Sequence, residues 1–186
     1  HPVDKRTPGE RLGNCALHQV YGMSRIPVYG PTVLGFRCDE GGRVRLFFRY
    51  AHGLHFSGTT PDSYGDKFDK SLPSLVRLPE RSGFELAGAD GVFHPATAAI
   101  FVDCDIDDLI NAKVNVVDYN ATEFGIPINS RSIGTITLAT PEVPAPVMMR
   151  YAWRSWGPAP LVNDNDLPAH PFKLDLTDHT DSDHAE

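Results

Sequence analysis

The stretch Phe84-Glu85-Leu86-Ala87-Gly88-Ala89-Asp90-Gly91 decides the fold class of this chain. Its first half alternates in polarity, as a strand with one buried face does, and its second half has the small residues of a hairpin-like turn. Similar short strands are predicted at residues 43–48, 113–117, 135–138 and 147–153. Because 16 prolines and 16 glycines punctuate the chain, the pattern predicts a mainly β fold, an antiparallel β-sandwich or jelly-roll-like module.

One amphipathic helix is predicted ahead of the strands, over residues 8–21. Thr7, Pro8 and Glu10 have the spacing of a capping box, with threonine as the N-cap and proline at the first helical position. Gly22 suits the C-terminal end of the helix. The apolar residues recur at helical spacing in one narrow stripe: Leu12, Cys15, Ala16 and Val20. Because a short helix cannot bury such a stripe by itself, we expect it to dock on another element.

Length, charge and hydropathy exclude several classes of partner. A chain of 186 residues can bury the core of one domain, or of one domain and part of another. The net charge of −7 argues against a nucleic acid or an anionic membrane as partner, since both select for basic patches. No apolar run approaches the roughly 20 residues that span a bilayer. Residues 175–186 are rich in aspartate and are predicted to be a disordered acidic tail.

The cysteines and histidines do not by themselves predict a metal site. Cys15, Cys38 and Cys104 form no Cys-x-x-Cys pair, and three cysteines do not decide the redox compartment. His52 and His55 are three residues apart, which suits a metal, but a polar loop containing glycine is the simpler interpretation. We therefore expect no metal and no cofactor.

Four blocks of sequence carry a resemblance to a known family. They occur in order along the chain: His1-Pro2-Val3-Asp4-Lys5, residues 83–96, residues 141–153 and residues 167–172. Together they resemble the C-terminal part of sialate O-acetylesterase-like enzymes, which are carbohydrate acetylesterases of the SGNH (GDSL-type) class. The chain departs from the family pattern at residues 53–80 and 100–136.

The resemblance implies a division of the chain. Residues 1–27 would be the C-terminal end of an α/β SGNH catalytic domain, including the amphipathic helix. Residues 28–174 would form the β-sandwich-like module, followed by the acidic tail. The family's other catalytic groups, namely the serine nucleophile, the triad aspartate and the oxyanion-hole donors, would lie on upstream segments.

The resemblance gives a catalytic role to His1. The family's histidine at the start of the His-Pro run is the general base of a serine esterase. Imidazole suits this role, because its pKa of about 6.5 lets it take and return the proton of a serine hydroxyl, which is a poor nucleophile by itself. We therefore expect the chain alone to be inactive. The expected partners are an acetylated carbohydrate substrate and an upstream SGNH catalytic segment or subunit, in a secreted, periplasmic or lysosomal location.

Two other functions remain open. The chain could be a non-catalytic carbohydrate-binding or structural β-module, which would not need the His1 block. It could also be a copper enzyme with an N-terminal histidine brace, although the downstream pattern of such enzymes is missing. Trp153 alternates with Tyr151 on a predicted strand, so core packing is preferred to stacking on a sugar, whereas both remain open for Trp156. No Gly-x-Ser-x-Gly run supports a serine nucleophile within the chain.

Overall fold

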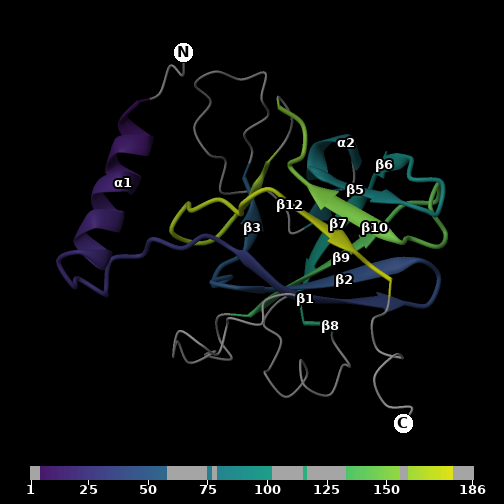
Figure 1. The fold of residues 1–186 in the computed structure, drawn as a ribbon, viewed down its shortest axis with the longest axis horizontal. Coiled ribbons are helices and arrows are strands. Elements are labelled where there is room, and N and C mark those ends of the chain that lie inside the picture. Colours follow the sequence, from purple (N-terminus) through teal and green to yellow (C-terminus); the bar gives the residue numbers. More distant parts are fainter. Residues whose placement is uncertain are drawn as a thin grey trace, which may run out of the picture.

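The computed structural model describes residues 5–57, 75–76, 79–101, 115–116, 133–155 and 159–177. Within these ranges the chain is mainly β, with antiparallel strands, an N-terminal helix set to one side and a second, short helix (Figure 1). Two sheets pack on each other in a sandwich-like arrangement. The predicted fold class, a mainly β antiparallel sandwich preceded by one helix, is confirmed.

The larger sheet has six strands, and neighbouring strands in it are antiparallel. Its centre is the hairpin of β1 (Thr32–Asp39) and β2 (Arg43–Arg49), joined by a turn that contains Gly41 and Gly42. Gly41 and Gly42 both have positive φ, at 76° and 74°, which explains the glycine pair. The other strands are β4 (Leu75–Val76), β7 (Thr97–Phe101), β9 (Gly134–Ala139) and β8 (Asn115–Val116), and the order is β4-β7-β9-β2-β1-β8.

The smaller sheet contains the stretch that indicated the fold. Its order is β12 (Phe172–Asp175), β10 (Met148–Tyr151), β5 (Phe84–Ala87) and β6 (Phe93–Pro95). The turn between β5 and β6 is closed by the Gly91 N–H, which donates to the Gly88 carbonyl at 3.0 Å. The short helix α2 (Pro79–Ser82) precedes β5, and a two-stranded ribbon joins β3 (His55–Phe56) to β11 (Leu161–Val162).

The core lies between the two sheets and includes apolar side chains from both. Val44, Leu46, Ile136 and Leu138 come from the larger sheet, and Phe84, Leu86, Met149, Tyr151 and Leu174 come from the smaller one. Tyr151 is fully buried, with its ring centroid 4.5 Å from that of Phe84. Its hydroxyl accepts a hydrogen bond from the Leu161 N–H at 2.8 Å, and burial raises the pKa of this phenol. One polar atom thus joins the ribbon to the core without a buried charge.

Helix α1 (Arg6–Gln19) begins earlier than predicted. Its N-cap is Lys5, and no side chain caps it, so the prediction of Thr7 as N-cap in a capping box is wrong. The first turn instead has an ion pair between Arg6 and Glu10, with Nε and Oε1 2.6 Å apart. Pro8 falls inside that first turn, where its missing N–H has no intrahelical acceptor to lose.

The apolar stripe of α1 is exposed except at Cys15. Leu12 and Val20 are 73% and 76% exposed, and no residue of the helix is buried. The half-buried residues along α1 are Thr7, Arg11, Cys15 and His18, which recur every three or four residues and so share one face. Within the described ranges, no helix has the length and apolar character needed to cross a membrane.

The last strand extends beyond the predicted end of the module. Asp175 is the final residue of β12, and Leu176 after it is only 3% exposed. The Leu176 N–H donates to the Val147 carbonyl at 2.8 Å. The ordered module therefore reaches at least Thr177, whereas the division at 174 had assigned these residues to the tail. The remaining residues of that predicted tail, 178–186, lie outside the described residues.

Candidate functional site

The predicted catalytic base lies outside the described part of the chain. The structure describes the chain from Lys5 onward, so it gives no position for His1 or for the next three residues. His1 therefore stays a prediction. Two groups of polar side chains within the described residues are the other candidates: a loop network that contains a histidine–carboxylate pair, and a hollow beside Trp153.

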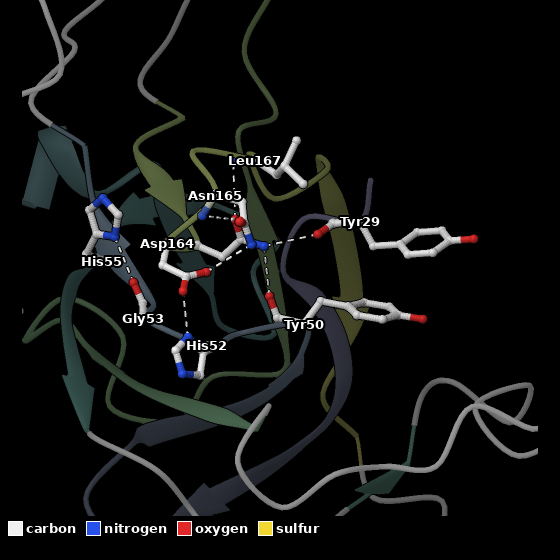
Figure 2. A network of polar contacts seen from close by, with 9 residues as sticks. Tyr29, Tyr50, His52, Gly53, His55, Asp164, Asn165 and Leu167 are labelled. Carbon is white, nitrogen blue, oxygen red and sulfur yellow. Dashed lines mark hydrogen bonds and ion pairs between the residues drawn. The ribbon is translucent and has the colours of Figure 1, made fainter. Parts of the chain in front are cut away.

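The loop network is organised by Asn163, which is only 3% exposed. Its side-chain amide donates to the carbonyls of Tyr29 and Tyr50, at 3.0 and 3.1 Å, and Figure 2 shows these two tyrosines side by side. Its side-chain oxygen accepts from the N–H groups of Asn165 and Leu167, at 3.1 and 3.2 Å. One buried amide with all these partners therefore joins the segment after α1, the end of β2 and the loop after β11.

A histidine–aspartate pair lies at the surface end of this network. His52 Nδ1 is 2.6 Å from Asp164 Oδ2, and the Asp164 N–H donates to the His52 carbonyl at 3.0 Å (Figure 2). Gly53 between them has φ +62, and a Cβ there would lie 2.6 Å from the Asp164 Cβ. Only glycine fits this close approach. Side chains 112 residues apart in the chain are thus held together by their backbones.

The chemistry open to His52 is limited by its exposure. Its side chain is 71% exposed and that of Asp164 is 42% exposed, so the pair is solvated and adds little to stability. A carboxylate on Nδ1 orients the imidazole and leaves Nε2 available, as a general base requires. His55 Nδ1 donates instead to the Gly53 carbonyl at 2.8 Å. The described residues contain no group of three or more potential metal ligands.

The second candidate is built around Glu85 on β5. Its carboxylate accepts from Arg150 Nε at 2.6 Å and from Arg154 Nη2 at 2.7 Å, while its side chain is 8% exposed. Burial by itself would raise the pKa of Glu85, but the two arginines outweigh it and lower that pKa, so the carboxylate is ionised at neutral pH. The Arg150 guanidinium also lies over the Phe93 ring, 3.9 Å from its centroid.

The structure corrects the interpretation of Trp153, for which core packing was preferred. β10 ends at Tyr151, and Ala152 has φ +50, which takes the chain out of the sheet. The alternation that would have buried Trp153 therefore stops one residue short, and its side chain is 52% exposed. It lines a hollow together with Phe84, Glu85, Pro95 and Arg154.

Helix α1 contacts the module through polar groups at its inner face. Arg11 Nη2 donates to the Asp166 carbonyl at 3.0 Å, and His18 Nδ1 donates to the Ile26 carbonyl at 2.8 Å. A cleft of about 220 Å³ separates Cys15 from Pro168 and the neighbouring loops. Gly30 is tightly packed in the same region, since a Cβ there would lie 2.0 Å from the Pro168 carbonyl oxygen.

The fold of the chain can now be compared with those of known proteins. The chain is a β-sandwich module with an attached helix, similar to a segment of a carbohydrate acetylesterase. One similar solved structure is that of XAC1771, described as a novel carbohydrate acetylesterase from Xanthomonas citri. It matches 94% of this chain with a TM-score of 0.57 and 26% sequence identity, and the chain spans 29% of that protein's length. No family model and no curated protein matches the chain.

Proposed function

We propose that this chain is the C-terminal portion of a serine-type carbohydrate O-acetylesterase of the sialate O-acetylesterase-like class, and that His1 is its catalytic base. The observation that carries the proposal is the likeness to an acetylesterase segment over 94% of the chain. The order of the four family-like blocks, from the His1 run to residues 167–172, supports it independently. The enzyme removes O-acetyl groups from sugars and works in a secreted, periplasmic or lysosomal location.

The mechanism divides the catalytic groups between this chain and the upstream SGNH segment. The upstream serine attacks the acetyl carbonyl while His1 takes its hydroxyl proton, and His1 then protonates the departing sugar oxygen. The upstream aspartate orients His1, and upstream N–H donors stabilise the oxyanion. Without the nucleophile and these donors, His1 has no proton to transfer.

The exposed side chains of helix α1 favour the presence of a large partner on the N-terminal side of the module. Leu12 in α1, and Val20 and Tyr21 directly after it, are each more than 70% exposed, so large apolar side chains face solvent along a helix that follows His1 by only a few residues. An exposed apolar face of this kind is typical of an interaction surface. The upstream catalytic segment is the partner that we assign to it, which would place His1 beside the serine.

The first test uses the 186-residue chain alone. We expect no hydrolysis of p-nitrophenyl acetate above a heat-denatured control, because the nucleophile and oxyanion donors are upstream. Hydrolysis that a serine-directed reagent abolishes would show a nucleophile within this chain and would contradict the proposed division of the catalytic groups.

The second test uses the intact enzyme that includes the upstream segment. We expect His1→Ala to lower kcat by about 10²–10⁴-fold, as loss of a general base commonly does. The matched control is His52→Ala, because His52 is the histidine paired with a carboxylate in the described part of the chain. His52→Ala should leave kcat within about twofold. The opposite result, a loss of activity in His52→Ala but not in His1→Ala, would assign the role of general base to His52 in the loop network.

A further inference from the structure

Trp153 is presented to solvent on a rigid part of the module. It follows β10 directly, and Tyr151 before it is fully buried. The Ala152 N–H donates to the Gly83 carbonyl at 2.9 Å, which fixes the turn that carries the indole. The indole is 52% exposed, so a ligand can reach it from solvent.

Polar groups of defined orientation lie beside the indole in the same hollow. Each oxygen of Glu85 accepts one arginine N–H, and each keeps a further lone pair for another donor. Arg154 is 61% exposed and donates to Glu85 through Nη2, which leaves other guanidinium N–H groups directed elsewhere. The hollow therefore offers both acceptors and donors next to an apolar ring face, as sites for small polar ligands do.

The charges of the hollow balance. Glu80 and Glu85 line it with Arg154, and Arg150 completes the ion pairs of Glu85 from the same sheet. Two carboxylates and two guanidinium groups leave no excess positive charge for an acidic ligand, and the whole chain carries −7. This balance favours a neutral ligand over a sugar acid or a phosphate.

The hollow is open to solvent and suits a small substituent of such a ligand. Its volume for the centres of water-sized groups is about 30 Å³, which admits a hydroxyl or hydroxymethyl group. A pyranose would therefore lie flat on the indole with one substituent in the hollow. Sugars of the glucose and xylose type suit this geometry, because their axial C–H groups give the ring an apolar face while their hydroxyls lie at its edge.

We propose that the Trp153 hollow is a non-catalytic subsite for a neutral pyranose of a polysaccharide chain, stacked on Trp153 and hydrogen-bonded to Glu85 and Arg154. This subsite holds the polysaccharide and cleaves no bond. The proposal goes beyond the proposed esterase function and does not depend on it, because binding requires neither His1 nor an upstream nucleophile.

Isothermal titration of the 186-residue chain with cellohexaose and xylohexaose tests the proposal. We expect measurable binding to at least one of the two and none to free N-acetylneuraminic acid, an acidic sugar with no neutral pyranose attached. Trp153→Ala should raise Kd about tenfold or more, as truncation of a central aromatic contact does. Arg154→Ala should weaken binding by a smaller factor without unfolding, since its side chain is mostly exposed.

The matched control is Phe101→Ala, which removes an aromatic side chain of similar exposure, 56%, on another strand. It should bind like the unmodified chain. Absence of binding to both oligosaccharides would overturn the proposal. Equal affinities for Trp153→Ala and the unmodified chain would overturn it too. So would a Trp153→Ala variant that binds the oligosaccharides normally but no longer assembles with an upstream segment.

Discussion

The β-sandwich and helix α1 are stabilised in different ways. The sandwich buries aromatic and aliphatic side chains from both sheets, and Phe84, Leu46 and Ile136 are completely inaccessible. Helix α1 buries no residue, and it contacts the rest of the chain through hydrogen bonds of Arg11 and His18 and an edge-on ring contact between His18 and Tyr29. Burial dominates folding energetics, so the sandwich is stable by itself and the helix is not.

The difference shows where an additional partner would contribute most. The sandwich has its apolar side chains in its own core, whereas α1 exposes Leu12 and Val20 on the face that turns away from it. An apolar face of a helix is usually covered by another element. The proposed upstream catalytic segment would supply that cover, and the following predictions test the contrast between the two regions.

The largest expected effect comes from removing a core aromatic ring. Phe84 is fully buried and its ring contacts those of Tyr151 and Phe172, so Phe84→Ala should destabilise the chain by about 3–5 kcal/mol. Leu12→Ala, on the exposed face of α1, should change the free energy of unfolding by no more than about 0.5 kcal/mol. Urea unfolding of both variants makes the measurement. A comparable loss in the two would show that α1 belongs to the cooperative unit of the sandwich.

The next effect concerns the junction between the two regions. Asn163→Ala leaves the carbonyls of Tyr29 and Tyr50 and the N–H of Leu167 without their side-chain partner, and should cost about 2–3 kcal/mol. The control is Asn165→Ala, whose side chain bonds only Asp164 at an exposed position. That variant should lose less than about 1 kcal/mol. Equal losses, measured by urea unfolding, would mean that the buried amide does not stabilise the junction.

The strands could be predicted from the sequence, and the candidate sites mostly could not. Alternating polarity and glycine-containing turns are local signals, so β2, β5 and β9 and the turn after β5 were found where the pattern placed them. The contacts of Asn163 reach 134 and 113 residues along the chain, and no local pattern reports them.

Two errors have local physical causes. The alternation from Tyr151 to Trp153 was interpreted as a continuous strand, but the positive φ of Ala152 ends it, and alanine gives little warning of that conformation. The apolar stripe of α1 was identified from its spacing, whereas the face toward the module is the one with Arg11 and His18. Spacing predicts which residues share a face and does not tell what that face contacts.

The smallest effect is a pH dependence of the stability of the sandwich. Hydrogen bonds and charges from Arg150 and Arg154 lower the pKa of Glu85 below its usual 4.5, despite burial. A carboxyl with a lowered pKa in the folded state stabilises the protein above its unfolded pKa, and this contribution is lost as the pH falls through the folded value. Glu85→Gln should therefore cost about 1–2 kcal/mol at pH 7, a modest figure because the exposed Arg154 is screened by solvent.

The cost of Glu85→Gln should shrink as the pH falls through the lowered folded-state pKa of Glu85, because Glu85 is then itself protonated in the unmodified chain. Urea unfolding of both proteins from pH 7 to pH 3 measures this convergence, with the exposed Glu80→Gln on α2 as the control that should change little at any pH. A difference that stays constant over this range would mean that the carboxylate acts through packing alone. In that case Glu85 would hold Arg150 and Arg154 through packing and hydrogen bonds that do not require its charge.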